Sequence, residues 1–206
     1  MSFAPGHISL TFAIHNHVDP LKMGSTGLGI VLPKGVYCSI VDDNNEGERN
    51  TIIIENKIVE DPVVLRAIEL LGYGNKGLSV YLRRDLPIGA GFGISGASAL
   101  AACLELDKNL KNCTVASHQA EIEYKTGLGD VVAISSALDK GDFPLIVERM
   151  TPGSNGKTDT YAVDSKLVVC VSGLGRNTSD IISNPCLLYT SDAADERSSV
   201  DLGGRR

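Results

Sequence analysis

Four glycines and a serine fall within eight residues of one stretch, PIGAGFGISGASA at positions 87–99. Small helix-forming residues follow directly. Where a glycine-rich turn enters a helix, the first backbone N–H groups have no intrahelical partner, and the helix dipole places partial positive charge there. Glycine lets the backbone adopt positive φ and approach an anion closely. The stretch therefore predicts a phosphate-binding loop rather than only a tight turn. Its expected members are Pro87, Gly89, Gly91, Gly93, Ser95, Gly96 and Ala97.

Other glycine motifs fit the same stretch less well. Residues 91–96 formally satisfy GxGxxG, but that dinucleotide fingerprint needs an acid about 20 residues later, at a strand end. This chain has the polar sequence KNCTVASHQAE there. No lysine follows the glycines as in a Walker A or protein-kinase motif, and Ala97 stands where a nucleophile elbow needs glycine. A Rossmann oxidoreductase remains an alternative, which predicts binding of NAD and not of ATP.

Carboxylates suited to phosphoryl transfer follow the loop. Mg²⁺ prefers hard oxygen ligands, which the Ser95 hydroxyl and a nearby acid could provide. Glu121 and Glu123 lie two positions apart on a predicted helix, so only one of them can face the loop. Asp130 follows a glycine-rich turn, where a helix N-cap and a catalytic carboxylate are both compatible with the pattern.

Bulk composition limits the classes of partner. The chain has 206 residues, 43% hydrophobic and 21% charged, with a net charge of −6. An acidic balance argues against nucleic acid or an anionic membrane as the main partner. No apolar run is long enough to span a bilayer, and the N-terminus does not resemble a signal peptide. The five isolated cysteines then indicate reduced thiols, mostly in the core, of a cytoplasmic protein.

The secondary structure around these residues is predicted from hydrophobic periodicity and from the positions of glycine, proline and capping residues. Strands are expected at 7–14, 29–41, 50–59, 77–87 and 143–150. Helices are expected at 61–72, 95–106, 114–127 and 128–141. Asp61 is placed to cap the first helix and Gly72 to end it. This order of elements indicates an α+β fold rather than a doubly wound sheet.

The C-terminal part is expected to differ. The polar segment 151–159 predicts a domain boundary, 166–173 a buried strand, and 178–185 the start of a helix. Residues 186–206 are polar and lack an apolar period. A disordered tail would explain them, but we favour another interpretation, because CLLYTSDAADE and SSVDLGGRR resemble a translated transposon-end sequencing adapter. The genuine sequence is then expected to stop near Pro185.

The loop resembles the P-x-x-x-G-x-G-S-S-A-A motif of the GHMP kinases. Pro87, Gly91, Gly93, Ser95 and Ala97 occupy its positions, whereas Ile94 and Gly96 depart from the usual Ser-Ser-Ala. The segment FAPGHISLTF resembles the N-terminal motif of the same family. Three further segments resemble its archaeal pantoate kinase subfamily: DPLKMGSTGLGIVLPKGV, HQAEIEYKTGLGDVVA and SGLGRNTSDII. The resemblance extends over residues 3–185.

This resemblance implies a two-domain α+β fold. Residues 1–150 would form an ATP-binding domain like ribosomal protein S5 domain 2, and 151–185 the start of a truncated ferredoxin-like domain. ATP and Mg²⁺ would be the cofactors, with Ser95 and Glu121 as metal ligands. The apolar strand expected at 166–173 would not be fully covered by the rest of the truncated domain. The fragment is therefore expected to be poorly stable and inactive.

Roles on the acceptor side come from the same resemblance. Asp130 would orient or deprotonate the attacking hydroxyl. Arg149 would bind an acceptor carboxylate, with Lys22 as a second candidate; either could instead be a surface charge. Ser25 and His7 would line the acceptor pocket, although a lone histidine such as His7 is more often structural.

The implied reaction transfers phosphate from ATP to (R)-pantoate, giving 4-phosphopantoate for coenzyme A biosynthesis. Three alternatives remain open beside it: a mevalonate or homoserine kinase of the same family, a non-catalytic nucleotide-binding protein on the same scaffold, and the oxidoreductase. A homodimer is possible, and nucleic acid and membrane partners are not expected.

Overall fold

The computed structural model describes residues 1–43, 47–141 and 143–164. Its strands are β1 (Ser2–Ser9), β2 (Ala13–His15), β3 (Gly24–Asp42), β4 (Thr51–Ile54), β5 (Lys57–Val59), β6 (Leu78–Arg84), β7 (Leu145–Arg149) and β8 (Thr158–Ala162). Its helices are α1 (Pro62–Ile68), α2 (Ile94–Leu106), α3 (Leu110–Tyr124) and α4 (Asp130–Lys140), and a π-helical turn, η1 (Glu69–Tyr73), continues α1. None of the described helices is long and apolar enough to cross a membrane.

All eight described strands belong to one sheet, in the order β5-β4-β6-β3-β7-β8, with β1 and β2 also paired to β3. The β4–β6 pair is parallel and the other pairs are antiparallel. The 19-residue β3 pairs with β7 through residues 27–31 and with β6 through residues 36–42. The long strand therefore joins the two halves of the sheet.

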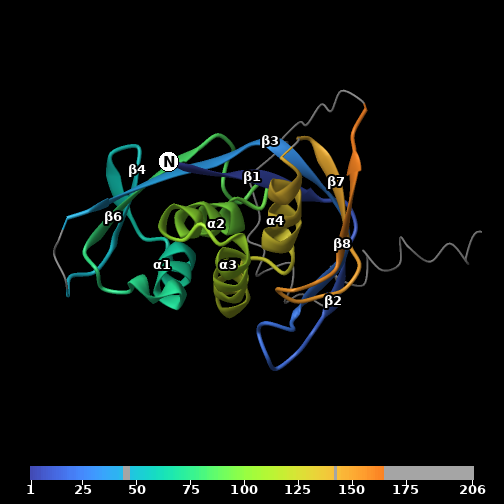
Figure 1. Cartoon of the computed structure of the whole chain (residues 1–206), viewed down its shortest axis with the longest axis horizontal. Coiled ribbons are helices and arrows are strands. Elements are labelled where there is room, and N and C mark those ends of the chain that lie inside the picture. Colours follow the sequence, from blue (N-terminus) through green and yellow to red (C-terminus); the bar gives the residue numbers. More distant parts are fainter. Residues whose placement is uncertain (44–46, 142, 165–206) are drawn as a thin grey trace, which may run out of the picture.

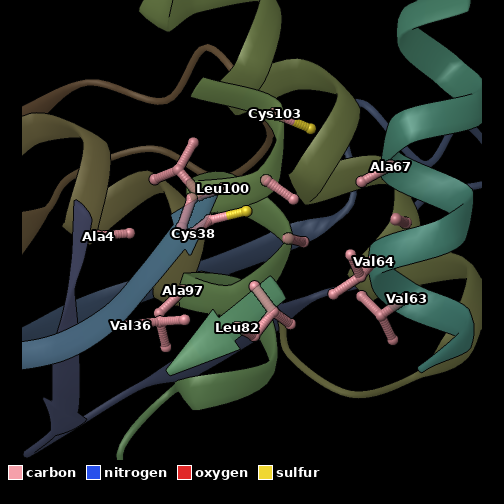
Figure 2. Packing of buried hydrophobic residues seen from close by; sticks show 14 of the residues in the cluster. Ala4, Val36, Cys38, Val63, Val64, Ala67, Leu82, Ala97, Leu100 and Cys103 are labelled. Carbon is pink, nitrogen blue, oxygen red and sulfur yellow. The ribbon is translucent and has the colours of Figure 1, made fainter. Parts of the chain in front are cut away.

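The four α-helices lie together on one face of this sheet (Figure 1). Helix α2 is central and contacts β1, β3, α1 and α3. Its buried face is made mainly of alanines, which allow close approach, and Leu100 and Ala97 lie near Val36 and Cys38 of β3 (Figure 2). This packing fixes the N-terminus of α2, and with it the end of the glycine loop, against the sheet.

Three of the cysteines confirm their predicted place in the core. Cys38, Cys103 and Cys113 are buried, free thiols. Burial raises the pKa of each thiol to about 12, so these side chains act as small apolar residues. Cys170 and Cys186 lie outside the described residues.

The residues predicted to begin and end the first helix do so in the structure. The Asp61 carboxylate accepts a hydrogen bond from the Val64 N–H at 3.2 Å and caps α1, and Gly72 takes φ 89° where the π-helical turn ends. The helix expected at 114–127 begins earlier, at Leu110, because the Asn109 side chain caps it. The α+β class is confirmed.

Strand boundaries differ more from the expectation. The segment 50–59 is a hairpin rather than one strand, because Glu55 and Asn56 adopt positive φ and form a tight turn between β4 and β5. The segment 7–14 is divided between β1 and β2, and β1 begins at Ser2. Antiparallel pairing with β3 extends β1 towards the N-terminus over residues whose composition is weak for a strand.

The chain beyond Met150 returns to the same sheet. After the predicted loop, β8 pairs with β7 from Thr158 to Ala162, a strand that the sequence analysis did not identify. The boundary expected at residue 150 stays a prediction. The strand at 166–173, the helix from 178 and the tail 186–206 lie outside the described residues.

Candidate active site

The glycine loop connects β6 to α2 and is open to solvent. Gly89, Gly91 and Gly93 have φ values of 72°, 79° and 60°, which an L side chain adopts only with strain. No atom lies within 4 Å of a Cβ built at Gly89 or Gly91. Gly93 is the N-cap of α2, and no side chain caps this helix. The loop thus presents backbone and empty space at a helix N-terminus, as anion binding requires.

The end of the loop is attached to the sheet beside an acid. The His7 N–H of β1 donates to the Phe92 carbonyl at 2.8 Å, and Phe92 is buried. A Cβ at Gly93 would lie 3.1 Å from the Asp130 Cβ. The structure therefore brings the last loop glycine into contact with the predicted catalytic aspartate, 37 residues later in the chain.

Asp130 does not act as the N-cap that its position allowed. Gly129 is the N-cap of α4, and Asp130 is the first helical residue. Its Oδ1 lies 2.6 Å from Nδ1 of His7. Burial alone would raise the pKa of this carboxyl, but the hydrogen bond from His7 and the positive charge of Arg149 outweigh burial and lower it. Asp130 is therefore ionised at neutral pH.

A buried arginine completes a hydrogen-bonded chain of three side chains. Nη1 of Arg149, at the end of β7, lies 3.2 Å from Nε2 of His7. Because a guanidinium can only donate, Nε2 of His7 accepts, and Nδ1 carries the hydrogen that is donated to Asp130. His7 is 0% exposed and Arg149 is 2% exposed. We call His7, Asp130 and Arg149 the acceptor cluster.

Two glycines leave room for this cluster. A Cβ at Gly29 would lie within 1.9 Å of His7 Nε2, and a Cβ at Gly129 would lie 2.5 Å from Ser25 Oγ and 2.7 Å from Arg149 Nε. The predicted pocket residue Ser25 is thus brought beside Arg149. Nε of Arg149 is buried and has no hydrogen-bond partner among the described residues, so this donor is left unsatisfied.

Glu121 lies behind the loop. Burial raises the pKa of this carboxyl well above its usual range, and the nearby charge of Asp130 raises it further. A Cβ at Gly96 or Gly127 would lie 2.7 Å or 2.4 Å from its Oε2, and the Thr126 hydroxyl donates to Oε1 at 3.4 Å. Since Gly96 directly follows Ser95, the carboxylate is adjacent to the first turn of α2. The glycine at 96, which departs from the family motif, makes room for it.

The choice between the two glutamates is clear in the packing. Glu123 lies on the outer surface, where its Oε2 is 2.7 Å from Nε of Arg66. Glu121 is 1% exposed and faces the loop. Ser95 Oγ makes no hydrogen bond with a described residue, so it is free to bind a ligand. No cluster of three or more His, Cys, Asp or Glu side chains that could hold a metal is present in the described part of the chain.

Lys22 is placed differently from the other predicted substrate residues. Its Nζ lies 3.9 Å from Asp19 Oδ2, and its side chain is 69% exposed. Within the described ranges it forms no hydrogen bond or ion pair with the acceptor cluster. Its backbone nevertheless belongs to the turn that packs against Gly153 and leads into β3.

One buried residue near the site was not predicted. Nε2 of His118 in α3 lies 2.9 Å from the Met23 carbonyl, and so connects this helix to the turn before Ser25. Burial lowers the pKa of His118 and favours its neutral form, although hydrogen bonds to backbone carbonyls oppose the shift. The only sequence signal was a histidine three positions before Glu121 on one helix face.

Comparison with known proteins agrees with this arrangement. Residues 62–137 match the family model for the N-terminal domain of GHMP kinases. The chain is 34% identical over 189 residues to the pantoate kinase of Methanocaldococcus jannaschii, covering 88% of this chain and 65% of that protein. It is 30% identical over 195 residues to the pantoate kinase of Methanospirillum hungatei, covering 89% and 63%. The chain thus spans less than two thirds of the length of these curated relatives.

Solved structures support the same fold. A phosphotransferase related to the CoA biosynthesis pathway superposes with a TM-score of 0.66 at 29% identity, covering 79% of this chain and 57% of that one. Galactokinase of Lactococcus lactis, complexed with galactose, superposes with a TM-score of 0.51 at 15% identity, covering 79% and 47%. The second likeness concerns the fold alone.

Proposed function

We propose that this chain, whose residues 62–137 match the model for the N-terminal domain of GHMP kinases, is part of an ATP-dependent kinase that phosphorylates pantoate. The observation that carries the proposal is the acceptor cluster. An ionised carboxylate, Asp130, lies between the last loop glycine, Gly93, and a buried, incompletely paired arginine, Arg149. A phosphate donor and a carboxylate-bearing acceptor could thus meet at one aspartate.

The nucleotide side is assigned to the loop and α2. Open backbone at Gly89 and Gly91, together with the uncapped N-terminus of α2, suits polyphosphate in a chain without a loop lysine. The Ser95 hydroxyl and the Glu121 carboxylate would hold Mg²⁺, and the raised pKa of Glu121 fits a buried acid whose positive partner arrives with the ligand. ATP, when bound with Mg²⁺, supplies the transferable phosphoryl group and part of its charge neutralisation.

The chemical step is assigned to Asp130. Its lowered pKa keeps it able to accept a hydrogen bond from an acceptor hydroxyl, and His7 fixes the direction of the carboxylate. In phosphoryl transfer, positioning and electrostatics contribute most of the rate, so Asp130 need not be a strong base. The 4-hydroxyl proton of pantoate would pass to this carboxylate as the new O–P bond forms, while the bond between the γ-phosphorus and the bridging oxygen of ATP breaks and ADP leaves.

The carboxylate of the acceptor is assigned to Arg149, with Ser25 beside it. A planar guanidinium binds a carboxylate through two parallel N–H groups, and burial strengthens such a pair. The unpartnered Nε of Arg149 supplies one of these donors. Pantoate carries both a carboxylate and a primary hydroxyl, and its phosphorylation to 4-phosphopantoate would serve coenzyme A biosynthesis.

The test compares acceptors in a full-length protein, because this chain spans less than two thirds of the length of its curated relatives. ADP release is measured with ATP, Mg²⁺ and equal concentrations of pantoate, mevalonate or homoserine. We expect pantoate to be preferred, and Asp130→Asn to lower kcat by about a thousandfold, within the range for a positioned acid–base group. Asp139→Asn is the matched control, because Asp139 is an exposed acid on the same helix.

Each alternative has its own outcome. Preference for mevalonate or homoserine would replace the acceptor while keeping the kinase. Tight ATP binding without turnover of any acceptor would favour a non-catalytic nucleotide-binding protein. An Asp130→Asn variant with the kcat of the wild type would remove the role assigned to Asp130.

A further inference from the structure

Side chains added at Gly89 and Gly91 would meet nothing within 4 Å, so we expect the geometry of this open loop to depend on how its two ends are held. The start follows β6, and the end is the first turn of α2. One side chain, Arg84, is the last residue of β6 and reaches the helix as well as the strand. We propose that Arg84 is a positioning residue for the loop and that it determines nucleotide affinity. This inference rests on the proposed function of the loop.

Arg84 contacts α2 through a buried hydroxyl. Its Nε donates to Ser98 Oγ at 3.1 Å, and this hydroxyl in turn donates to the Ile94 carbonyl at 2.7 Å. Ser98 is 0% exposed, and Ile94 is the first residue of α2. The guanidinium therefore connects residue 84, just before the loop, to residue 94, just after it. The two interactions close the base of the loop.

The guanidinium of Arg84 is also held by the carboxylate of Asp61. Its Nη2 lies 2.5 Å from Asp61 Oδ2, in a pair whose side chains are 14% and 12% exposed. Asp61 Oδ1 caps α1, so Asp61 is itself fixed. These two largely buried hydrogen bonds, one to Ser98 and one to Asp61, hold Arg84 in one conformation, and the guanidinium neutralises an acid whose charge also acts on Glu121.

The chain provides a matched control at the preceding position. Arg83 lies on the opposite face of β6, is 64% exposed, and pairs with Asp85 while its guanidinium lies 4.1 Å from the Tyr37 ring centre. Arg83→Met therefore removes the same charge from the same strand. It does not remove a link between β6 and α2.

The experiment measures Mg-ADP affinity by calorimetry and ATP kinetics in the full-length protein. We expect Arg84→Met to raise both the dissociation constant and the KM for ATP about tenfold, the size of one charged hydrogen bond, with kcat and the acceptor KM within about twofold. Ser98→Ala should raise both values about threefold. Arg84→Lys should recover part of the loss, because lysine keeps the pair with Asp61. Arg83→Met should bind Mg-ADP like the wild type.

The outcomes separate this inference from the proposed function. Unchanged Mg-ADP affinity in Arg84→Met, even with a lowered Tm, would leave Arg84 merely structural and overturn the inference. If that variant does not fold, unchanged affinity in folded Ser98→Ala overturns it equally. A wild-type protein that binds Mg-ADP but phosphorylates none of the acceptors contradicts the proposed reaction alone, and the affinities still decide on Arg84. A wild type that does not bind Mg-ADP overturns both.

Discussion

The glycine loop and the acceptor cluster use the same residue type in opposite ways. In the loop, Gly89 and Gly91 have positive φ and empty space around them, so glycine serves the backbone conformation. Around the cluster, Gly29 lies against His7, and Gly129 lies against Ser25 and Arg149. Glycine is needed there because a Cβ would overlap these neighbouring side chains. One region is exposed backbone and the other is buried side chains.

This difference separates what each region can recognise. The loop offers backbone N–H groups and a helix dipole, which favour the negative charge of a polyphosphate and make little distinction between polyphosphates of different shape. The cluster offers one oriented carboxylate and one buried guanidinium, whose geometry selects the acceptor. Substitutions should therefore affect nucleotide affinity in the first region and acceptor turnover, together with stability, in the second.

The largest effect is expected from removing the buried guanidinium of Arg149. Arg149→Met should lower kcat/KM for the acceptor about a thousandfold, because the acceptor carboxylate would then be buried without its positive partner. The KM for ATP should change little. Steady-state kinetics with varied acceptor and varied ATP measure both values. Arg66→Met, which removes an exposed ion pair of Glu123, is the control, and an equal loss in that variant would contradict the assignment.

Exchanging alanine for glycine in the two regions sharpens the distinction. Gly29→Ala should lower the free energy of unfolding by about 2 to 3 kcal/mol, because His7 is held at both ring nitrogens and cannot move aside. Gly89→Ala should cost about 1 kcal/mol, since only positive φ opposes it, but should weaken Mg-ADP binding. Chemical denaturation and calorimetry give both quantities. Equal stability losses would show that the two classes of glycine are not distinct.

A pH series tests the buried acid between the two regions. The pKa of Glu121 is higher in the folded protein than in the unfolded chain. At any pH between these two pKa values, the folded protein therefore keeps the Glu121 proton that the unfolded chain has lost. The free energy of unfolding of the wild type should therefore fall as pH rises through this window, by at most about 1.4 kcal/mol per unit.

The Glu121→Gln variant should lack this decline and should need more Mg²⁺ for activity. Denaturation between about pH 5 and 8, above the range in which the lowered pKa of Asp130 matters, measures the slope. Glu123→Gln is the control, because Glu123 is an exposed partner of Arg66 and its pKa is lowered. A slope that persists in Glu121→Gln would assign the titration to another group.

The smallest expected effect concerns Lys22. Its exposed ammonium pairs with Asp19, so Lys22→Met should change the acceptor KM by less than about threefold, as for other solvent-exposed ion pairs. Initial rates over a range of acceptor concentrations test this. If Lys22→Met lowered kcat/KM for the acceptor as much as Arg149→Met does, Lys22 would have to be assigned as a carboxylate ligand beside the cluster.

The loop was predictable because its signal is local. Gly89, Gly91 and Gly93 are close in sequence, and their geometry follows from spacing and from the helix after them. The capping of α1 by Asp61 follows from a similarly short-range rule, whereas the spacing of Glu121 and Glu123 predicted only that they face different ways, and the family resemblance favoured Glu121. The loop and the cap depend on neighbours along the chain, which the sequence states directly.

The acceptor cluster could not be derived from spacing. His7 and Arg149 are separated by 142 positions, and only the pairing of β1 and β7 with β3 brings them together. The family resemblance supplied these residues, and the roles assigned to them stay predictions. For the same reason the sequence analysis missed β8 and the contact between His118 and Met23, which depend on tertiary partners.

The length of β3 has a consequence for biosynthesis. This strand pairs with β1 at once, but the partner of Gly27 in β7 is Arg149, which leaves the ribosome more than a hundred residues later. Until then one edge of β3 offers unpaired amides and carbonyls to any nascent chain nearby. Slow translation before β7 should therefore reduce the yield of folded protein more than its final stability would suggest.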